Sequence, residues 1–469
     1  MSGGLDVVIV GAGIGGLGSA LALGRAGHRV TLVERDDTPM PADVEGAFEW
    51  DRRGAPQVRH PHVFLGLART ILRDRFPDVL AALTDLGIEP PVPKAGPTMP
   101  FDEETLAILA ADDDLRMLPC RRTTFEWVMR RAVLAEPNVD LRVGHGVRGV
   151  EATTGEGPRQ VTGVHLDDGT VLRADLVVAT TGRRGDVPAW LAEHGVEVAE
   201  EVHDAGVVYF SRYYKAHHDD DFGFRGAFGA GLGVGVIGAD ARTFSITAIV
   251  DKEDKELRAH LNDDDRFEAT VRLMPELADV VAAPYEPIHP VHCMTGLINR
   301  TRTFTAADGT PLVRGLVAVG DAHTCTNPAY GRGQSLALRQ AVLLADALEA
   351  TDDVLEAARA YEAASAEQVV PWYRFSMLTD QMRSMTSRGG RGGGAPGGPG
   401  GFDPSVLFGA GDPETVRTAM RVFNLLDPPD AIIALLPKLQ AAAASRPAPQ
   451  RTGPKVKRPT REQVLALAG

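Results

Sequence analysis

A run of glycines near the N-terminus, Gly11-Ala-Gly13-Ile-Gly-Gly16, constrains this 469-residue chain more than any other feature. Residues 6–10 form a short apolar run typical of a buried strand, residues 14–26 are small, apolar and helical in character, and residues 28–33 predict a second strand. Gly11 allows a tight turn, Gly13 lets the backbone approach a pyrophosphate, and Gly16 lets helix and strand pack closely. The run therefore predicts a right-handed βαβ unit that binds a nucleotide phosphate at the helix N-terminus.

A carboxylate at the end of the second strand narrows the choice of nucleotide. Glu34 follows the glycine run by 18 residues. A carboxylate here accepts hydrogen bonds from ribose hydroxyls and repels a 2′-phosphate, which favours FAD or NAD over NADP. We assign cofactor binding in this unit to three glycines and to two charged residues at the strand end: Gly11, Gly13, Gly16, Glu34 and Arg35.

The rest of the chain changes character several times. Residues 206–214 and 243–250 alternate with period two, which predicts an antiparallel sheet with one buried face. A second glycine match at 233–238 precedes no predicted helix, so we expect a glycine-rich strand or turn there. A buried-strand pattern returns at 316–321 and is followed by a long helix through residue 350.

These patterns predict an α/β protein with a discontinuous Rossmann-like domain. It comprises residues 1–185 plus 293–350, with a β-rich substrate domain at 186–292 that also takes in the proline-rich loop 87–100. A C-terminal helical region follows at 351–388 and 402–445. The low-complexity stretch 389–401 predicts a flexible linker, and residues 446–469 form a basic tail.

Charge and cysteine content exclude several classes of protein. The formal net charge is −14, from 49 basic and 63 acidic residues, and such an acidic surface disfavours nucleic-acid binding. Three scattered cysteines fit a reduced, cytoplasmic setting. Glycines interrupt the apolar stretch 5–23, so we expect no membrane span. The tail has basic but no acidic residues from 431 to 461 and could touch an anionic surface, but we expect a solvated end.

A second motif, residues 315–336, reads as strand, loop and glycine-opened helix. It resembles the second FAD motif of the class A flavoprotein monooxygenases, the para-hydroxybenzoate hydroxylase superfamily, whose FAD domain is of the GR2 type. The resemblance implies that Asp321 holds the ribityl chain of FAD and that Pro328, Gly331 and Gly333 lie against the isoalloxazine. A helix start stabilises negative charge on a reduced flavin, and glycines allow close approach to a flat ring.

Two further stretches extend the resemblance. Arg122-Thr-Thr-Phe125-Glu-Trp-Val-Met129 is similar to the class pattern in which a helix-start arginine points to the cofactor; an ordinary surface arginine is the alternative. Gln57-Val-Arg59-His60-Pro-His62 resembles the actinobacterial flavin epoxidases that act on polyether precursors. That resemblance implies a loop lining the flavin, with Arg59 near its phosphates or ring. A purely structural role for His60 and His62 is the alternative, and no carboxylate or cysteine cluster supports a metal site.

Two departures from the class affect the predicted chemistry. Thr181-Gly182 stands where many hydroxylases carry Asp-Gly, which implies reduction by a separate flavin reductase, while direct use of NAD(P)H stays open. The Trp-x-Trp-x-Ile-Pro signature of flavin halogenases is missing, because all four tryptophans stand alone.

The resemblance implies a FAD-dependent monooxygenase. One oxygen atom from O2 passes through a flavin C4a-hydroperoxide to a small apolar alkene, polyene or aromatic, by epoxidation or hydroxylation. The substrate would lie between the flavin and the inserted sheet. Candidate wall residues, each also compatible with an ordinary core role, are Tyr209, Phe210, Tyr213, Phe224 and Phe228. The alternatives are a flavin-dependent prenyl-chain reductase or desaturase and a non-oxygenating FAD-binding protein.

Overall fold

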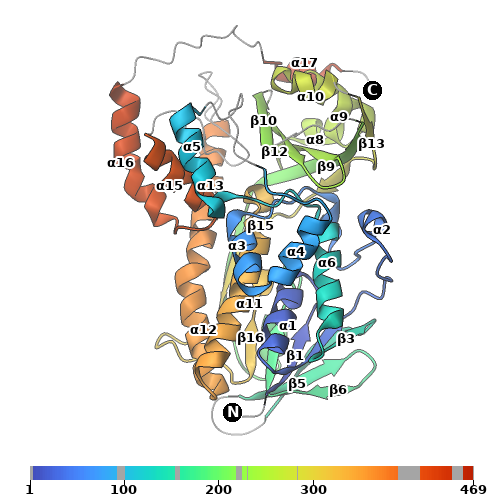
Figure 1. Cartoon of the computed structure of the whole chain (residues 1–469), viewed down its shortest axis with the longest axis vertical. Coiled ribbons are helices and arrows are strands. Elements are labelled where there is room, and N and C mark those ends of the chain that lie inside the picture. Colours follow the sequence, from blue (N-terminus) through green and yellow to red (C-terminus); the bar gives the residue numbers. More distant parts are fainter. Residues whose placement is uncertain are drawn as a thin grey trace.

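A five-stranded parallel sheet forms the centre of the larger part of the molecule (Figure 1). The computed structural model describes residues 4–91, 101–153, 159–217, 224–229, 231–282, 284–388, 412–445 and 458–467. The predicted linker 389–401 and residues 92–100 of the proline-rich loop lie outside these ranges. In the order β16-β7-β1-β2-β3, the strands are Leu316–Ala318, Leu176–Ala179, Asp6–Val10, Arg29–Glu34 and Val139–Val143.

Alternate residues of the central strand pack against different layers. Val7 and Ile9 join the cluster formed with α1 (Ile14–Arg25), α6 (Arg122–Ala135) and α11 (Arg332–Ala350). Val8 and Val10 face a three-stranded sheet on the other side. That sheet contains β4 (Val147–Ala152), β5 (Val161–Leu166) and β6 (Val171–Arg173). A strand that is buried on both faces reads as a continuous apolar run, which is the pattern of residues 7–10.

The β-rich part is built around an antiparallel sheet of six strands, as the period-two pattern predicted. The path is β10-β11-β12-β9-β13, and β14 also pairs with β9. In chain order the strands are β9 (Val207–Ala216), β10 (Phe224–Gly229), β11 (Leu232–Gly238), β12 (Thr243–Asp251), β13 (Tyr285–Pro287) and β14 (His292–Met294). The second glycine match is strand β11, which confirms that interpretation. One face packs on α8 (Lys255–Leu261), α9 (Asp264–Arg272) and α10 (Ala278–Ala282).

A smaller sheet links the two parts. It pairs β15 (Ile298–Thr303) with β8 (Ala199–Asp204) on one side and with β17 (Thr324–Cys325) on the other. The α/β fold with an inserted antiparallel sheet and C-terminal helices is therefore confirmed.

Shorter helices surround the N-terminal unit: α2 (Val44–Glu49), α3 (Gly66–Arg75), α4 (Pro77–Asp85), α5 (Glu103–Ala111) and α7 (Val187–Ala192). Short 3-10 turns occur at Pro56–Arg59, Asp113–Leu115, Pro275–Leu277, Gly320–Ala322 and Pro328–Tyr330. Helices α3 and α4 are separated at Phe76, because Pro77 has no N–H with which to continue the preceding helix.

The C-terminal helices lie along one side of the parallel-sheet unit (Figure 1). They are α12 (Val354–Gln368), α13 (Val370–Arg388), α15 (Pro413–Phe423) and α16 (Asp430–Ser445). Asp112, just after α5, is ion-paired to Arg417 and Arg421 of α15 at 2.8 and 2.9 Å. These pairs fasten α15 beside the N-terminal half of the chain.

The described end of the tail packs against the β-rich part. Helix α17 (Arg461–Leu465) buries Val464 in the cluster that covers the antiparallel sheet (Figure 1). Arg461 pairs with Asp254 at 2.8 Å, and Arg458 pairs with Glu276 at 2.8 Å. The expected solvated end is therefore wrong for residues 458–467, where basic side chains meet acidic helix starts. Within the described ranges, no helix is long and apolar enough to cross a membrane.

Candidate functional site

A cavity of about 910 Å³ lies where the parallel sheet, the antiparallel sheet and the C-terminal helices meet. Its walls come from the carboxyl ends of β1, β2, β7 and β16, from the face of the antiparallel sheet opposite α8 and α9, and from α13, α15 and α16. Open α/β sheets bind ligands outside the carboxyl ends of their strands. The volume lies at the upper end of the 300 to roughly 1,000 Å³ usual for ligand sites.

The glycine loop gives this cavity a bare stretch of backbone. Gly13 and Gly15 line it, and a Cβ on Gly13 would meet only Nη2 of Arg122, at 4.0 Å. Gly11 has a φ of +103°, and a Cβ on Gly16 would come within 1.8 Å of the Gly11 carbonyl oxygen. Gly11 thus makes the turn, Gly16 allows close packing, and Gly13 leaves the backbone open to the cavity, as the spacing of the three glycines predicted.

Arg122 reaches the glycine loop from the first turn of α6. Its guanidinium pairs with Glu126 Oε1 at 2.7 Å and lines the cavity beside Gly13. Burial alone would raise the pKa of Glu126, but the guanidinium groups of Arg122 and Arg52 hold it below its ordinary value. The carboxylate therefore stays charged and fixes both arginines.

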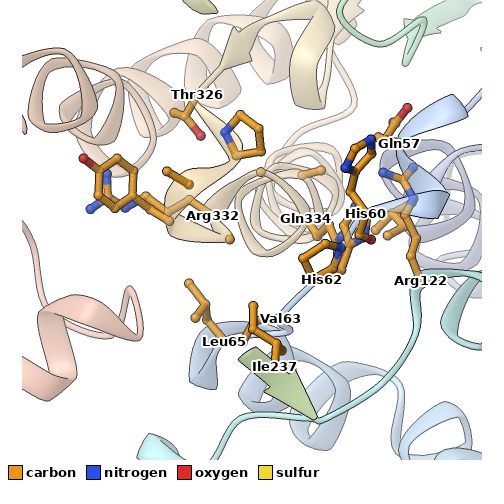
Figure 2. Close-up of a pocket in the computed structure, with 18 of the residues that line it drawn as sticks. Gln57, His60, His62, Val63, Leu65, Arg122, Ile237, Thr326, Arg332 and Gln334 are labelled. Carbon is orange, nitrogen blue, oxygen red and sulfur yellow. The ribbon is translucent and has the colours of Figure 1, made fainter. Parts of the chain in front are cut away.

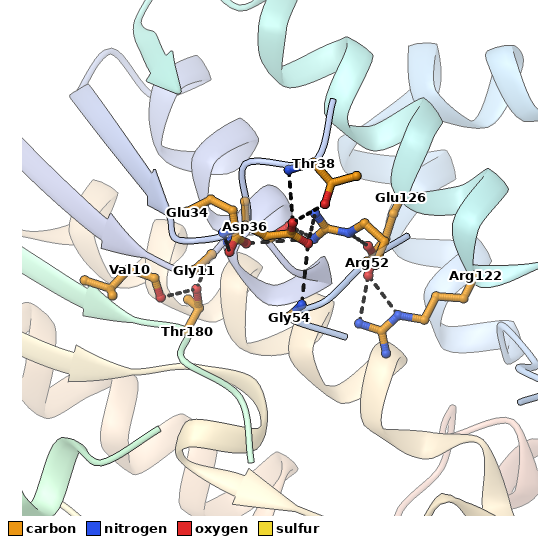
Figure 3. A network of polar contacts seen from close by, with 11 residues as sticks. Val10, Gly11, Glu34, Asp36, Thr38, Arg52, Gly54, Arg122, Glu126 and Thr180 are labelled. Carbon is orange, nitrogen blue, oxygen red and sulfur yellow. Dashed lines mark hydrogen bonds and ion pairs between the residues drawn. The ribbon is translucent and has the colours of Figure 1, made fainter. Parts of the chain in front are cut away.

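Glu34 belongs to the same buried network (Figure 3). It accepts the backbone N–H groups of Ala12 and Asp36, both at 2.9 Å, and lies 3.8 Å from Arg52 Nη2. Arg52 also contacts Asp36 at 3.6 Å and Glu126 at 3.0 Å. Glu34 does not line the cavity, whereas its neighbour Arg35 does. The contact between Glu34 and a ribose therefore stays a prediction.

Asp321 follows β16 and lies on the cavity wall. Burial raises its pKa, and the nearby guanidinium groups of Arg122, Arg183 and Arg300 oppose that rise. Its Oδ1 would be 3.6 Å from a Cβ on Gly333, so Asp321 adjoins the first turn of α11.

The start of α11 opens into the same space. Gly331 adopts a left-handed conformation with a φ of +64° and is the N-cap of the helix. Pro328, Gly331 and Gly333 all line the cavity. The first N–H groups of a helix have no partner within it, so this end presents donors and a partial positive charge.

The loop before α3 places Gln57, His60 and His62 on the cavity wall. Arg59 of the same loop does not line the cavity. His60 Nδ1 is 2.9 Å from Ser211 Oγ, and His62 Nδ1 is 2.8 Å from the His60 carbonyl oxygen. Burial, with a smaller effect of His292, lowers the pKa of His60 to about 3. Arg59 instead donates to the Phe48 carbonyl at 3.1 Å and lies outside the lining. The turn at 56–59 thus directs Arg59 toward α2, and its place near the phosphates or ring of FAD stays a prediction.

The candidate substrate residues separate by strand face. Tyr209 lines the cavity, and its hydroxyl donates to Asn327 Oδ1 at 2.8 Å. Phe210 points the other way, into the core with Tyr214 and Phe244, so its assignment as a wall residue is wrong. Tyr213 also lies outside the lining and donates to the His60 carbonyl. The side chains of Phe224 and Phe228 lie outside the described residues.

Several lining residues were not foreseen from the sequence. Thr326 Oγ1 and Gln334 Oε1 are buried in the wall, and within the described ranges neither has a hydrogen-bond partner. Arg332 lines the cavity from within the glycine-opened helix start, and Phe375, Ala419 and Phe423 reach it from α13 and α15. The glycine-containing motif at the start of α11 predicted a site here. No sequence motif indicates that α13 and α15 also form part of its wall.

Comparison with known proteins agrees with this architecture. Residues 9–42 match the family of NAD(P)-binding Rossmann-like domains, so the chain contains a dinucleotide-binding unit of that type. A relative over nearly the whole length is Protein Rv3254 of Mycobacterium tuberculosis, 26% identical over 460 residues, which cover 90% of this chain and 89% of the relative.

Solved structures share the fold at low identity. The p-nitrophenol 4-monooxygenase PnpA of Pseudomonas putida is 19% identical with a TM-score of 0.61, covering 90% of this chain and 98% of its own. PqsL, a probable FAD-dependent monooxygenase of Pseudomonas aeruginosa, is 19% identical with a TM-score of 0.59, covering 81% and 96%. The flavin-dependent brominase Bmp2 is 18% identical with a TM-score of 0.57, covering 90% and 99%. The chain thus has a fold that flavin-dependent oxygenases and halogenases share.

Proposed function

We propose that this protein is a FAD-dependent monooxygenase that inserts one oxygen atom from O2 into an organic substrate, by epoxidation or hydroxylation. The observation that carries the proposal is the continuity of the cavity. One space joins the open backbone at Gly13, the buried Asp321, the start of α11 and the free face of the antiparallel sheet.

The residues present fit an extended FAD. Gly13 leaves room for a pyrophosphate, and Arg122 lies 4.0 Å from that space to pair with its charge. Asp321 offers a carboxylate for ribityl hydroxyls, and Gln334 Oε1, at the start of α11, is a buried acceptor that no described residue satisfies. Such orphaned groups are costly unless a ligand satisfies them.

Bound FAD would supply the activation of O2, and this chain's residues would bind, orient and exclude water. The donors at the start of α11 would stabilise negative charge on the ring beside them. Tyr209, held by Asn327, would form part of a rigid wall on the substrate side. His60 stays neutral and holds Ser211, which in turn lies 2.7 Å from the cavity residue Thr247.

The source of electrons belongs to the same proposal. Thr181 and Gly182 line the cavity where many hydroxylases carry Asp-Gly, which favours a separate flavin reductase over direct NAD(P)H use. Anaerobic mixing of the FAD-loaded protein with NADH or NADPH should bleach the flavin slowly, and added flavin reductase should accelerate the bleaching at least tenfold. Equally fast bleaching without the reductase would contradict this part.

An oxygen-18 experiment tests the main proposal. FAD-loaded protein, NADH and a flavin reductase are incubated under ¹⁸O2 with a panel of styrenes, polyenes and phenols and their carboxylic acids. The proposal expects a product that contains one ¹⁸O atom. Products altered only in hydrogen content would indicate a reductase or desaturase instead, and no product from any compound would count against an oxygenase.

A further inference from the structure

One buried, charged side chain of the cavity wall forms no ion pair with the residues that the structure describes. Arg332, in the first turn of α11, has only 4% of its surface exposed. Its Nη1 donates to Ser376 Oγ at 2.6 Å. Among the described residues, no carboxylate forms an ion pair with it. Asp380, one turn beyond Ser376 on α13, accepts instead from the amide groups of Asn299 and Asn327 at 2.7 and 2.9 Å.

Aromatic rings surround this guanidinium. Its carbon lies 4.3 Å from the ring centre of Tyr330, 5.0 Å from that of Phe375 and 5.2 Å from that of Trp372. Ring faces compensate part of the cost of burying a cation. Burial lowers the pKa of Arg332 to about 10, and the nearby Tyr330 and Asp380 oppose that fall, so the group remains charged at neutral pH. A charged, buried group with one hydrogen bond retains capacity for an anion.

A second unsatisfied group lies in the same part of the wall. Thr326 is 6% exposed and lines the cavity, and its Oγ1 has no hydrogen-bond partner among the residues that the structure describes. Figure 2 shows Arg332 and Thr326 on one side of the cavity, with Gln57, His60 and Arg122 on the other. Arg122, which adjoins the glycine loop and shares its guanidinium with Glu126, lies at the proposed pyrophosphate site and is therefore a separate anion site.

We propose that the substrate of this cavity is an organic anion with an apolar body, whose carboxylate is bound by Arg332 with Thr326 as a second donor. Guanidinium matches the planar geometry of a carboxylate, and a desolvated charge-assisted bond is stronger than a neutral one. The apolar side chains Leu65 and Phe375 that share this wall would cover the rest of the molecule. The proposal deepens the proposed function, on which it rests for the reaction.

Matched ligands test the proposal by binding alone. Calorimetric titration of the FAD-loaded protein with phenylacetate, 3-phenylpropanoate and 5-phenylpentanoate is compared with titration by the corresponding amides. The wild type should bind at least one carboxylate about tenfold or more tightly than its amide. R332Q should abolish that preference, R332K should keep part of it, and T326V should reduce it. R339Q, on the same helix but outside the cavity lining, should leave it unchanged.

Flavin content separates this proposal from the proposed function. Visible absorbance reports FAD bound to each variant, and the titrations are repeated on FAD-free protein. Lost carboxylate preference with full FAD content in R332Q supports the assignment of Arg332. A wild type that binds no carboxylate tighter than its amide, or a folded R332Q or R332K with undiminished preference, overturns it. If FAD fails to bind while the carboxylate preference persists, only the proposed function falls.

Discussion

Charged residues around the cavity differ in whether the protein itself satisfies them. Arg52 and Glu126 bind each other in a buried network away from the cavity wall, whereas Asp321 lies on that wall with the guanidinium groups of Arg122, Arg183 and Arg300 near its carboxylate. Groups of the first kind stabilise the fold, and groups of the second kind remain available to a ligand. Substitutions at the two kinds of position should therefore have separable effects.

Asp321→Ala should weaken FAD binding about tenfold or more, because it removes a charge-assisted hydrogen bond worth roughly 1.5–3 kcal/mol. Visible flavin absorbance after desalting and a calorimetric Kd measure the effect. Asp308→Ala, in an exposed turn where the carboxylate accepts from Thr310 N–H, is the control. Equal FAD affinity in both variants would exclude Asp321 from the cofactor site.

His60→Gln should remove part of the pH dependence of stability. The folded pKa of about 3 lies below the unfolded value of 6.5, so the unfolded chain binds the proton more readily between them. The contribution of His60 is complete above 6.5 and falls by about 2 kcal/mol between pH 7 and 5. Urea unfolding at pH 7 and pH 5 should show that the variant loses about 2 kcal/mol less stability than the wild type over this range. An identical loss in both proteins would indicate a solvated imidazole.

At the level of elements, α6 ties the glycine loop to the strand β2. Glu126 of α6 binds Arg52, which donates to the Ala12 carbonyl at 3.2 Å and contacts Glu34 at the end of β2. Helix, loop and strand thus share one buried network, which keeps the phosphate-facing backbone in place. The residue pattern of α6 predicted the helix but gave no sign of Arg52, which lies 74 residues earlier.

Glu126→Gln should destabilise the protein by about 3–5 kcal/mol, because it leaves the buried Arg52 and the partly buried Arg122 under-compensated. Urea unfolding measures this change, with Asp140→Asn, at an exposed pair on β3, as the control. Since the pKa of Glu126 is depressed, its contribution is complete above 4.5 and is lost as the pH falls through the lower folded value. The variant should therefore lose less stability on acidification, and a stability equal to that of the control would contradict the network.

Val464→Asp should release α17 from the antiparallel sheet. The side chain is fully buried among residues of α8 and α9, so a carboxylate there has no partner. Limited proteolysis should cleave the variant near its C-terminus faster than the wild type, with Glu462→Gln as the exposed control on the same helix. Unchanged cleavage would mean that α17 is not docked in solution.

At the scale of the whole molecule, the sequence predicted the two sheets and the two glycine-containing ends of the cavity. It did so because local patterns determine these features: an apolar run, a turn that needs Gly11 or Gly331, and a period of two. It could not predict which face of β9 lines the cavity, because Tyr209 and Phe210 are both aromatic. Helices α8 and α9 cover the face that carries Phe210, so the face that carries Tyr209 is the one left for the cavity. It also did not predict that α15 forms part of the cavity wall. Helix α15 packs beside Asp112, which lies 305 residues before Arg417, and contacts over such a separation leave no local sequence pattern.

The central claim is that one extended FAD spans from the glycine loop to the start of α11. A crystal structure of the protein grown with FAD tests this most directly. The account predicts the pyrophosphate beside Gly13 and Arg122, a ribityl hydroxyl on Asp321, and the flavin ring at Gly331 and Gly333. Crystals without density for FAD despite excess cofactor, or FAD bound elsewhere, would contradict it.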